Sequence, residues 1–197
     1  MKRTSAVVFA LLIIGIAALQ YTDEAAGQAT AGWTMLFDGK SLAAFNPIGN
    51  ANWEIVDGVV QANKGTGFLV TKNSYADFQI KLDFWVDDAA NSGVFIRCEN
   101  PKEVTAANAY EVNIYDKRPD QSYRTGGIVD VAKPASVINT GGKWNSFEIT
   151  AQGKRIIVTL NGTKMVDVEH AAHARGPVAL QYGAGIVKFR NVQIKPM

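Results

Sequence analysis

The stretch DFQIKLDFWVD, residues 77–87, decides the fold class. Apolar side chains recur at every second position along it, and polar side chains and Trp85 fall between them. Such alternation is typical of a β-strand with one buried face, because successive side chains of a strand point to opposite sides. The stretch therefore predicts a long strand. Its core face would consist of Phe78, Ile80, Leu82, Phe84 and Val86.

The same period of two continues elsewhere in the chain. GVFIRC, residues 93–98, alternates Val94, Ile96 and Cys98 with Phe95 and Arg97. Residues 144–168 read as consecutive strands joined at Gln152-Gly153 and at Asn161-Gly162, and Asn-Gly is the strongest short hairpin signal. Residues 185–196 supply a last long strand.

These patterns indicate an all-β protein. We count about a dozen strands with turns roughly every 8–12 residues, which favours a sandwich of two sheets. The specific expectation is a concanavalin A-like jelly-roll β-sandwich of two antiparallel sheets. Residues 100–109 are the only segment that suits a short helix or a long loop. With no linker visible, residues 32–197 are expected to form a single domain.

The N-terminus has the layout of a secretory signal peptide. Lys2 and Arg3 precede an apolar run of 14 residues, Ala6–Leu19, and small residues follow it. A membrane anchor is the alternative, but a spanning helix needs about 20 apolar residues. We expect residues 1–29 to be removed, which predicts a periplasmic or secreted protein with no stable membrane anchor.

Composition limits the partners and cofactors. The net charge of the chain is +2 and no Lys/Arg cluster stands out, so no nucleic-acid partner is expected. Cys98 is the only cysteine, which excludes an internal disulfide. His170 and His173 have a spacing that could bind a metal on a helix, but no third ligand is evident. No cofactor is indicated, and a divalent metal stays an open alternative.

One polar row could be a site. In YEVNIYDKRPD, residues 110–120, strand alternation puts Glu111, Asn113 and Tyr115 on one face, with Asp116 just beyond. Such a row is either the solvated face of a sheet or a binding site. For Asp116 the alternative is that it caps the turn that follows.

The ordered set of motifs is similar to a known family. GWTMLFDGKSL, WEIVDGVV, NSGVFIR, YEVNIYD, GGKWNSFEI, VTLNG, GPVALQYG and VKFRNVQIKP together resemble the 3-keto-disaccharide hydrolase domain family, long catalogued as a domain of unknown function. The resemblance runs from about Gly32 to Met197. It implies a concanavalin-like jelly roll and cleavage of glycosides that carry a ketone at sugar C3.

The chain departs from the family pattern in two places. Many members read Leu-Gln-Asp-His-Gly where this chain has LQYGAG, so Tyr182 and Gly183 stand at an acidic and a histidine position. Their usual Glu-x-Gln-x-x-Asp is here Glu111, Asn113 and Asp116. Whether the protein is an enzyme, a hydrolase or a lyase, therefore stays open, and the alternative is a carbohydrate-binding module without catalysis.

The reaction that the family implies needs few catalytic groups. A ketone at C3 makes the C2 proton acidic, one base can remove it, and the aglycone then leaves C1 by β-elimination. We expect Glu111 to be the base and Arg97 to stabilise the enolate. An ordinary glycosidase would instead need Glu111 and Asp116 as two carboxylates close together.

The remaining candidates would hold the sugar, a small carbohydrate. The substrate-binding set is Asn91, Asn113, Trp85, Tyr115 and Asp116. In this hypothesis Asn91 and Asn113 bind sugar hydroxyls, and Trp85 stacks on a sugar ring. We expect all these residues to lie in or near one concave pocket with Glu111 and Arg97. The alternatives are that Arg97 forms a cross-strand ion pair and that Asn91 belongs to a turn.

Overall fold

A computed structural model describes residues 32–197, and the predicted signal peptide, residues 1–29, lies outside this range. The described part contains thirteen strands and one short 3-10 helix, η1 (Gln121–Tyr123). The strands are β1 (Thr34–Phe37), β2 (Phe45–Gly49), β3 (Glu54–Val56), β4 (Val59–Ala62), β5 (Gly67–Thr71), β6 (Phe78–Val86), β7 (Ser92–Ile96), β8 (Tyr110–Ile114), β9 (Trp144–Gln152), β10 (Arg155–Leu160), β11 (Thr163–Glu169), β12 (Ala179–Tyr182) and β13 (Val187–Pro196). Within these residues no helix is both long and apolar enough to cross a bilayer.

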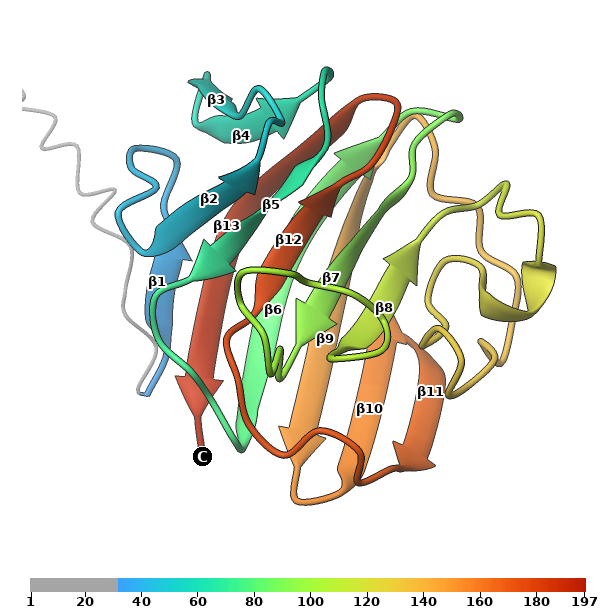
Figure 1. Cartoon of the computed structure of the whole chain (residues 1–197). Helices are drawn as coiled ribbons and strands as arrows, with labels where there is room; N and C mark the ends of the chain where they lie inside the picture. The colour runs from blue at the N-terminus through green and yellow to red at the C-terminus, as the bar shows by residue number, and fades with distance from the viewer. Residues whose placement is uncertain (1–31) are drawn as a thin grey trace, which may run out of the picture.

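The strands form two antiparallel sheets that pack face to face (Figure 1). The eight-stranded sheet has the order β11-β10-β9-β6-β13-β4-β3, and β1 pairs with the end of β13 that β4 leaves free. The five-stranded sheet has the order β2-β5-β12-β7-β8. The prediction of an all-β jelly-roll sandwich is confirmed.

The strand that decided the fold class lies in the middle of the larger sheet. β6 pairs with β9 on one side and with β13 on the other. Its five alternating apolar side chains are at most 3% exposed and belong to the core between the sheets. Burying each of them contributes about 1.5–3 kcal/mol.

The predicted hairpins are also present. β9, β10 and β11 follow one another as antiparallel neighbours. Asn161 and Gly162 join β10 to β11 with φ angles of 50° and 78°. Two successive positive φ angles define the tight turn that matches the twist of a hairpin, and Asn-Gly adopts them readily.

The connection between β7 and β8 is a long loop rather than a helix. It crosses in front of β7 and β12 (Figure 1). Val104 in this loop is buried against Phe95 and Ala179, which stand on the outer face of the five-stranded sheet. The loop therefore covers the part of that face around Phe95 and Ala179.

Candidate functional site

Glu111 stands on the outer face of the five-stranded sheet. Its neighbours on β8, Tyr110 and Val112, point into the core between the sheets. On the adjacent strand β7, Gly93 has no side chain. A Cβ there would lie 3.4 Å from Cγ of Glu111 and 3.5 Å from Oε1 of Gln181. Glu111 and Gln181 thus approach each other over Gly93, where a side chain would crowd them.

The surroundings of Glu111 change its acidity. Burial raises the pKa of this carboxyl from 4.5 to about 7, the positive charge of Arg118 opposes the shift, and the negative charge of Asp130 adds to it. Among the hydrogen bonds within residues 32–197, none involves the carboxylate of Glu111. A half-buried carboxylate with a pKa near neutrality and free oxygens is well suited to take up a proton.

This pKa gives a stability prediction. The pKa of Glu111 in the folded protein lies above its ordinary value, so ionisation costs stability, and the cost grows as the pH rises from 4.5 to about 7. Glu111→Gln removes that cost and should raise the free energy of unfolding at pH 8 by about 1–3 kcal/mol. Urea denaturation at pH 8 and at pH 4 checks this, since at pH 4 the gain should vanish. An equal effect at both pH values would contradict it.

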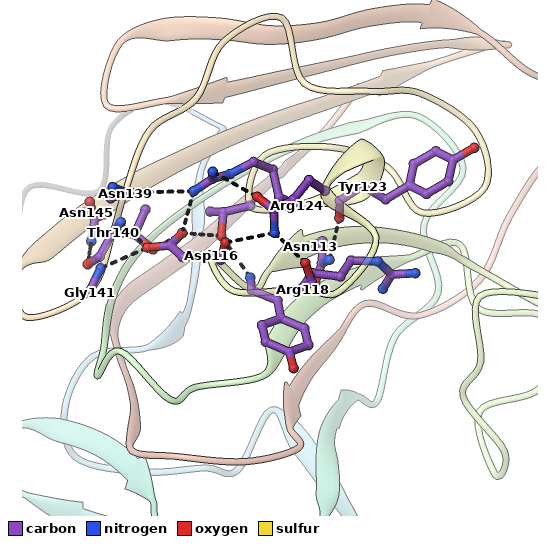
Figure 2. A network of polar contacts seen from close by, with 12 residues as sticks. Asn113, Asp116, Arg118, Tyr123, Arg124, Asn139, Thr140, Gly141 and Asn145 are labelled. Carbon is purple, nitrogen blue, oxygen red and sulfur yellow. Dashed lines mark hydrogen bonds and ion pairs between the residues drawn. The ribbon is translucent and has the colours of Figure 1, made fainter.

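Three buried polar atoms near Glu111 have no hydrogen-bond partner in the described part of the chain: Oδ1 of Asn113, Oε1 of Gln181 and Nε of Arg118. The orientation of the Asn113 amide is fixed, because its Nδ2 donates to the carbonyl oxygen of Tyr123 at 2.5 Å (Figure 2). Buried polar groups are normally paired, so three such atoms beside one carboxylate make this an unusually polar part of the interior.

A groove begins at Gln181 and runs over β12, β5 and β2. Its volume is about 470 Å³. The side chains that border it include Ile48, Phe68, Asn91, Lys102, Val104 and Gln181. Phe68 is half-buried and packs edge-on against Phe95, with 5.3 Å between the ring centres. Glu111, Gly93 and Gln181 with this groove form what we call the Glu111 site.

Tyr182 and Gly183, which depart from the family pattern, differ in their surroundings. Tyr182 is 4% exposed and points into the core, where its hydroxyl donates to the carbonyl oxygen of Gly185 at 3.0 Å. Gly183 borders the groove, and a Cβ there would meet Nδ2 of Asn91 at 3.2 Å. The backbone carbonyl and the side-chain amide of Asn91 therefore crowd position 183, where the family resemblance implies a histidine.

Asp116 lies outside the Glu111 site. One of its carboxylate oxygens accepts from the hydroxyls of Thr125 at 2.6 Å and Thr140 at 3.1 Å (Figure 2). The other accepts from the backbone N–H groups of Thr140 at 2.5 Å and Gly141 at 3.2 Å. These four donors anchor the long connection between β8 and β9. They leave Asp116 in the structural role of the turn interpretation rather than in the predicted substrate-binding one.

Removing the charge of Asp116 should weaken this anchor. In Asp116→Asn one carboxylate oxygen is kept as an acceptor, but an NH₂ group replaces the other and faces N–H or O–H donors that it cannot bind. The free energy of unfolding should therefore fall by about 1–3 kcal/mol. Asp120→Asn is the matched control, because Asp120 only caps the short helix η1 and Asn caps equally well. Urea denaturation of both variants checks the difference. Equal stability of the two would contradict the anchoring role.

The prediction that Arg97 shares a pocket with Glu111 is wrong. The guanidinium of Arg97 is 1% exposed and lies at the end of the sandwich, on the core side of the sheet. It donates to the carbonyl oxygens of Ala76 at 2.8 Å, Gly153 at 2.8 Å and His173 at 3.2 Å, and it pairs with Asp77 at 3.2 Å. Because β7 ends at Ile96 and Arg97 has a φ of 55°, the side chain leaves the phase of Phe95.

Trp85 does not lie near Glu111 either. Its neighbours Phe84 and Val86 fill the core, so Trp85 points outward from the eight-stranded sheet. Glu111 points outward from the five-stranded sheet, and the whole sandwich separates the two side chains. Of the other predicted residues, Asn113 adjoins Glu111 on β8, and Asn91 borders the groove at Gly183. Tyr115 is half-buried just beyond the end of β8.

Three residues of the site do not appear in the set predicted from the sequence. Gln181 and Arg118 present the unpartnered atoms described above, and Phe68 supplies an aromatic wall of the groove. Strand alternation in LQY, residues 180–182, places Gln181 opposite to its apolar neighbours. That signal was available but weak. Arg118 belongs to a basic loop that could form one wall of a groove, but such a loop is equally typical of a solvated charge cluster.

The two histidines of the chain lie outside the Glu111 site. His170 and His173 both pack edge-on against Tyr110, whose side chain faces the core. Within residues 32–197 no group of three or more His, Cys, Asp or Glu side chains gathers in a way that could hold a metal ion.

Comparisons with known proteins agree with this architecture. No curated protein matches the sequence significantly. Two structures from Parabacteroides distasonis ATCC 8503, both provisionally described as glycosyl hydrolases, are similar. One has 22% identity and a TM-score of 0.76 over 84% of this chain and 94% of the other. The second has 27% identity and a TM-score of 0.70 over 84% and 99%.

A carbohydrate-binding module, CBM66 from Bacillus subtilis, shares the fold as well. It has 18% identity and a TM-score of 0.60 over 83% of this chain and 95% of the module. The sequence itself matches one family over residues 32–195, which is nearly all of the described chain. The protein therefore belongs to the family of 3-keto-α-glucoside-1,2-lyase-like domains.

Proposed function

We propose that this protein cleaves the glycosidic bond of 3-keto-glycosides, with Glu111 as the base that starts the reaction. One observation carries the proposal. Glu111 combines a pKa of about 7 with a carboxylate free of internal hydrogen bonds, and it lies across Gly93 from Gln181, which borders a groove large enough for a sugar. The description of the family, which names a lyase acting across C1 and C2 of a 3-keto-glucoside, supports this reaction class.

The proposed reaction has two stages. Glu111 takes the proton from C2, and the electron pair of that C–H bond passes to the ketone at C3 as an enolate. The enolate then re-forms the ketone, a double bond forms between C1 and C2, and the bond from C1 to the aglycone oxygen breaks. The aglycone takes a proton from solvent and leaves as an alcohol, and Glu111 returns its proton to solvent. Addition of water across the double bond completes a net hydrolysis.

Other side chains of the site take positioning roles in this scheme. Arg118 carries the positive charge that acts on Glu111, and its Nε is buried without a partner. We assign to Arg118 the stabilisation of the enolate oxygen, the role that the sequence analysis gave to Arg97. Gln181 borders the groove and Asn113 adjoins Glu111 on β8, and we assign their amides to the sugar hydroxyls. Phe68 offers an aromatic surface to the apolar side of the ring.

The pH dependence of the reaction follows from the same carboxyl. Only ionised Glu111 can accept a proton, and its pKa is about 7. The value of kcat/KM should therefore rise with pH in proportion to the ionised fraction up to about pH 7 and level off above it. A pH–rate profile on a 3-keto-glucoside checks this. A rate that is constant from pH 5 to pH 8 would exclude Glu111 as the base.

Release of the aglycone tests the function directly. The protein is incubated with a chromogenic 3-keto-glucoside and with the parent glucoside that lacks the ketone, each with and without added divalent metal. Cleavage of the keto compound alone is the expected result, because only the ketone acidifies the C2 proton. Cleavage of both substrates at equal rates would indicate ordinary glycosidase chemistry instead.

Carbohydrate binding without turnover is the second candidate. The observation that favours it is the replacement at position 183, where the groove has Gly183 and the amide of Asn91 in place of a histidine. An amide binds hydroxyls but does not transfer protons at neutral pH. In this case the keto compound would bind in the groove without release of the aglycone, and Glu111→Gln would change only the affinity.

A further inference from the structure

The outer face of the eight-stranded sheet carries three of the four tryptophans. Trp85 on β6 and Trp144 on β9 are direct cross-strand partners, and both are half-buried. Trp33 precedes β1, and its ring lies below the ammonium group of Lys81, which points outward from β6. The fourth, Trp53, packs against Tyr182 and Phe189 of the core.

A cation lies over each of the three outer rings. The distances to the ring centres are 5.2 Å for Lys81 over Trp33, 4.9 Å for Lys188 over Trp85 and 4.0 Å for Arg190 over Trp144. Two of these cations are also paired with carboxylates. Lys81 contacts Glu148 at 3.1 Å, and Arg190 contacts Asp83 at 3.1 Å. These contacts hold the rings in place and compensate most of the charge.

A groove of about 390 Å³ lies on the same face, over β6, β9 and β13, and none of the three tryptophans lines it. Its polar side chains are Lys81, Asp83, Ser146, Glu148, Asn191 and Gln193. Trp33 lies beside Lys81. Trp85 follows Lys81 on β6 by four residues, so the backbones of Lys81 and Trp85 are about 13 Å apart. We call Trp33, Trp85, Trp144 and this groove the tryptophan face.

We propose that the tryptophan face is a second carbohydrate site, which binds a neutral glycan chain. A sugar ring has an apolar side that packs on an aromatic ring and a rim of hydroxyls that needs donors and acceptors. The tryptophan face offers both over a length that suits several sugar units. Carboxylates pair with Lys81 and Arg190, so only the charge of Lys188 is left uncompensated among the three cations, too little to select an acidic glycan.

The position of this face gives it a role apart from cleavage. It lies across the sandwich from Glu111, so one sugar unit cannot contact both sites. A glycan held on the tryptophan face would instead keep the protein attached to a polymer while the Glu111 site works on another part of it. Two linked sites raise the effective concentration of one ligand at the other.

Affinity electrophoresis tests this proposal. The protein is run in native gels that contain hydroxyethylcellulose, galactomannan, dextran or polygalacturonate. At least one of the three neutral polysaccharides should retard it, and polygalacturonate should not. Trp85→Ala and Trp144→Ala should each weaken the binding about tenfold, the loss expected for one aromatic stacking contact. Glu111→Gln and Phe68→Ala, on the opposite face, should be retarded like the parent protein.

A second measurement needs no variant. The four tryptophan indole N–H signals in a nitrogen–proton correlation spectrum are followed while a neutral oligosaccharide from the retarding polymer is added. Three signals should shift and one, from the core residue Trp53, should stay. The proposal is overturned by retardation in polygalacturonate alone, by no retardation in any gel, by unchanged binding of both tryptophan variants, or by loss of binding in Glu111→Gln. None of these outcomes depends on whether Glu111 is a catalytic base.

Discussion

Glu111→Gln should lower kcat for a 3-keto-glucoside by about 10²–10⁴-fold, the usual contribution of a general base. Gln has nearly the shape of Glu but cannot accept the C2 proton. The carboxylate of Glu111 holds no other residue in place within the described structure, so the fold should survive and KM should change little. Measured kcat and KM on a chromogenic 3-keto-glucoside check both parts of this expectation.

Glu103→Gln is the matched control for this experiment. Glu103 also borders the groove, but it is exposed and lies in the loop between β7 and β8. This second neutralised carboxylate should leave kcat nearly unchanged. Turnover in heavy water adds an independent readout, because water addition after elimination places solvent deuterium at C2 of the released 3-keto sugar. An active Glu111→Gln variant together with a C2 position free of deuterium would rule out the proposed mechanism.

The fold could be predicted because its determinants are local. The alternation in residues 77–87 specifies a strand and its buried face without reference to any other segment. Asn161-Gly162 specifies a tight hairpin through the φ angles that these two residues tolerate. The strong tendency of such strands to pair with their neighbours then leaves few architectures other than a sandwich.

The wrong placement of Trp85 shows what alternation cannot provide. The period of two correctly put Trp85 on the outer side of its strand. A sandwich, however, has two outer faces, and the pattern within one strand does not say to which sheet that strand belongs. Only the pairing of β6 with β9 and β13 assigns it to the sheet opposite Glu111.

The chemistry of Glu111 depends on tertiary structure in the same way. Sequence periodicity placed Glu111 and Asn113 on one face of β8. The raised pKa of Glu111 comes from burial, and the charges of Arg118 and Asp130 that modify it belong to the long connection after β8. No local pattern reports how such a connection folds back over a strand, which is why the sequence gives Arg118 no role at Glu111.

Arg97 gives the second prediction with a large expected effect. Arg97→Met should lower the free energy of unfolding by about 3–5 kcal/mol, because it leaves buried carbonyl oxygens without donors. Those of Ala76, Gly153 and His173 come from three separate segments, which the guanidinium joins at one end of the sandwich. Met keeps the volume of the apolar stem, so the loss measures the hydrogen bonds and the charge rather than a cavity.

Arg155→Met is the control that separates burial from the mere loss of an arginine. Arg155 makes a two-pronged ion pair with Asp167, at 2.8 Å and 2.9 Å, but its side chain is 56% exposed. Water replaces these bonds when Arg155 is removed, so this loss should stay within about 1 kcal/mol. Urea denaturation of both variants compares them. Below its melting temperature Arg97→Met should keep the kcat of the parent protein, because its guanidinium lies away from Glu111. A folded, stable Arg97→Met protein without activity would restore Arg97 to the catalytic role that the sequence suggested.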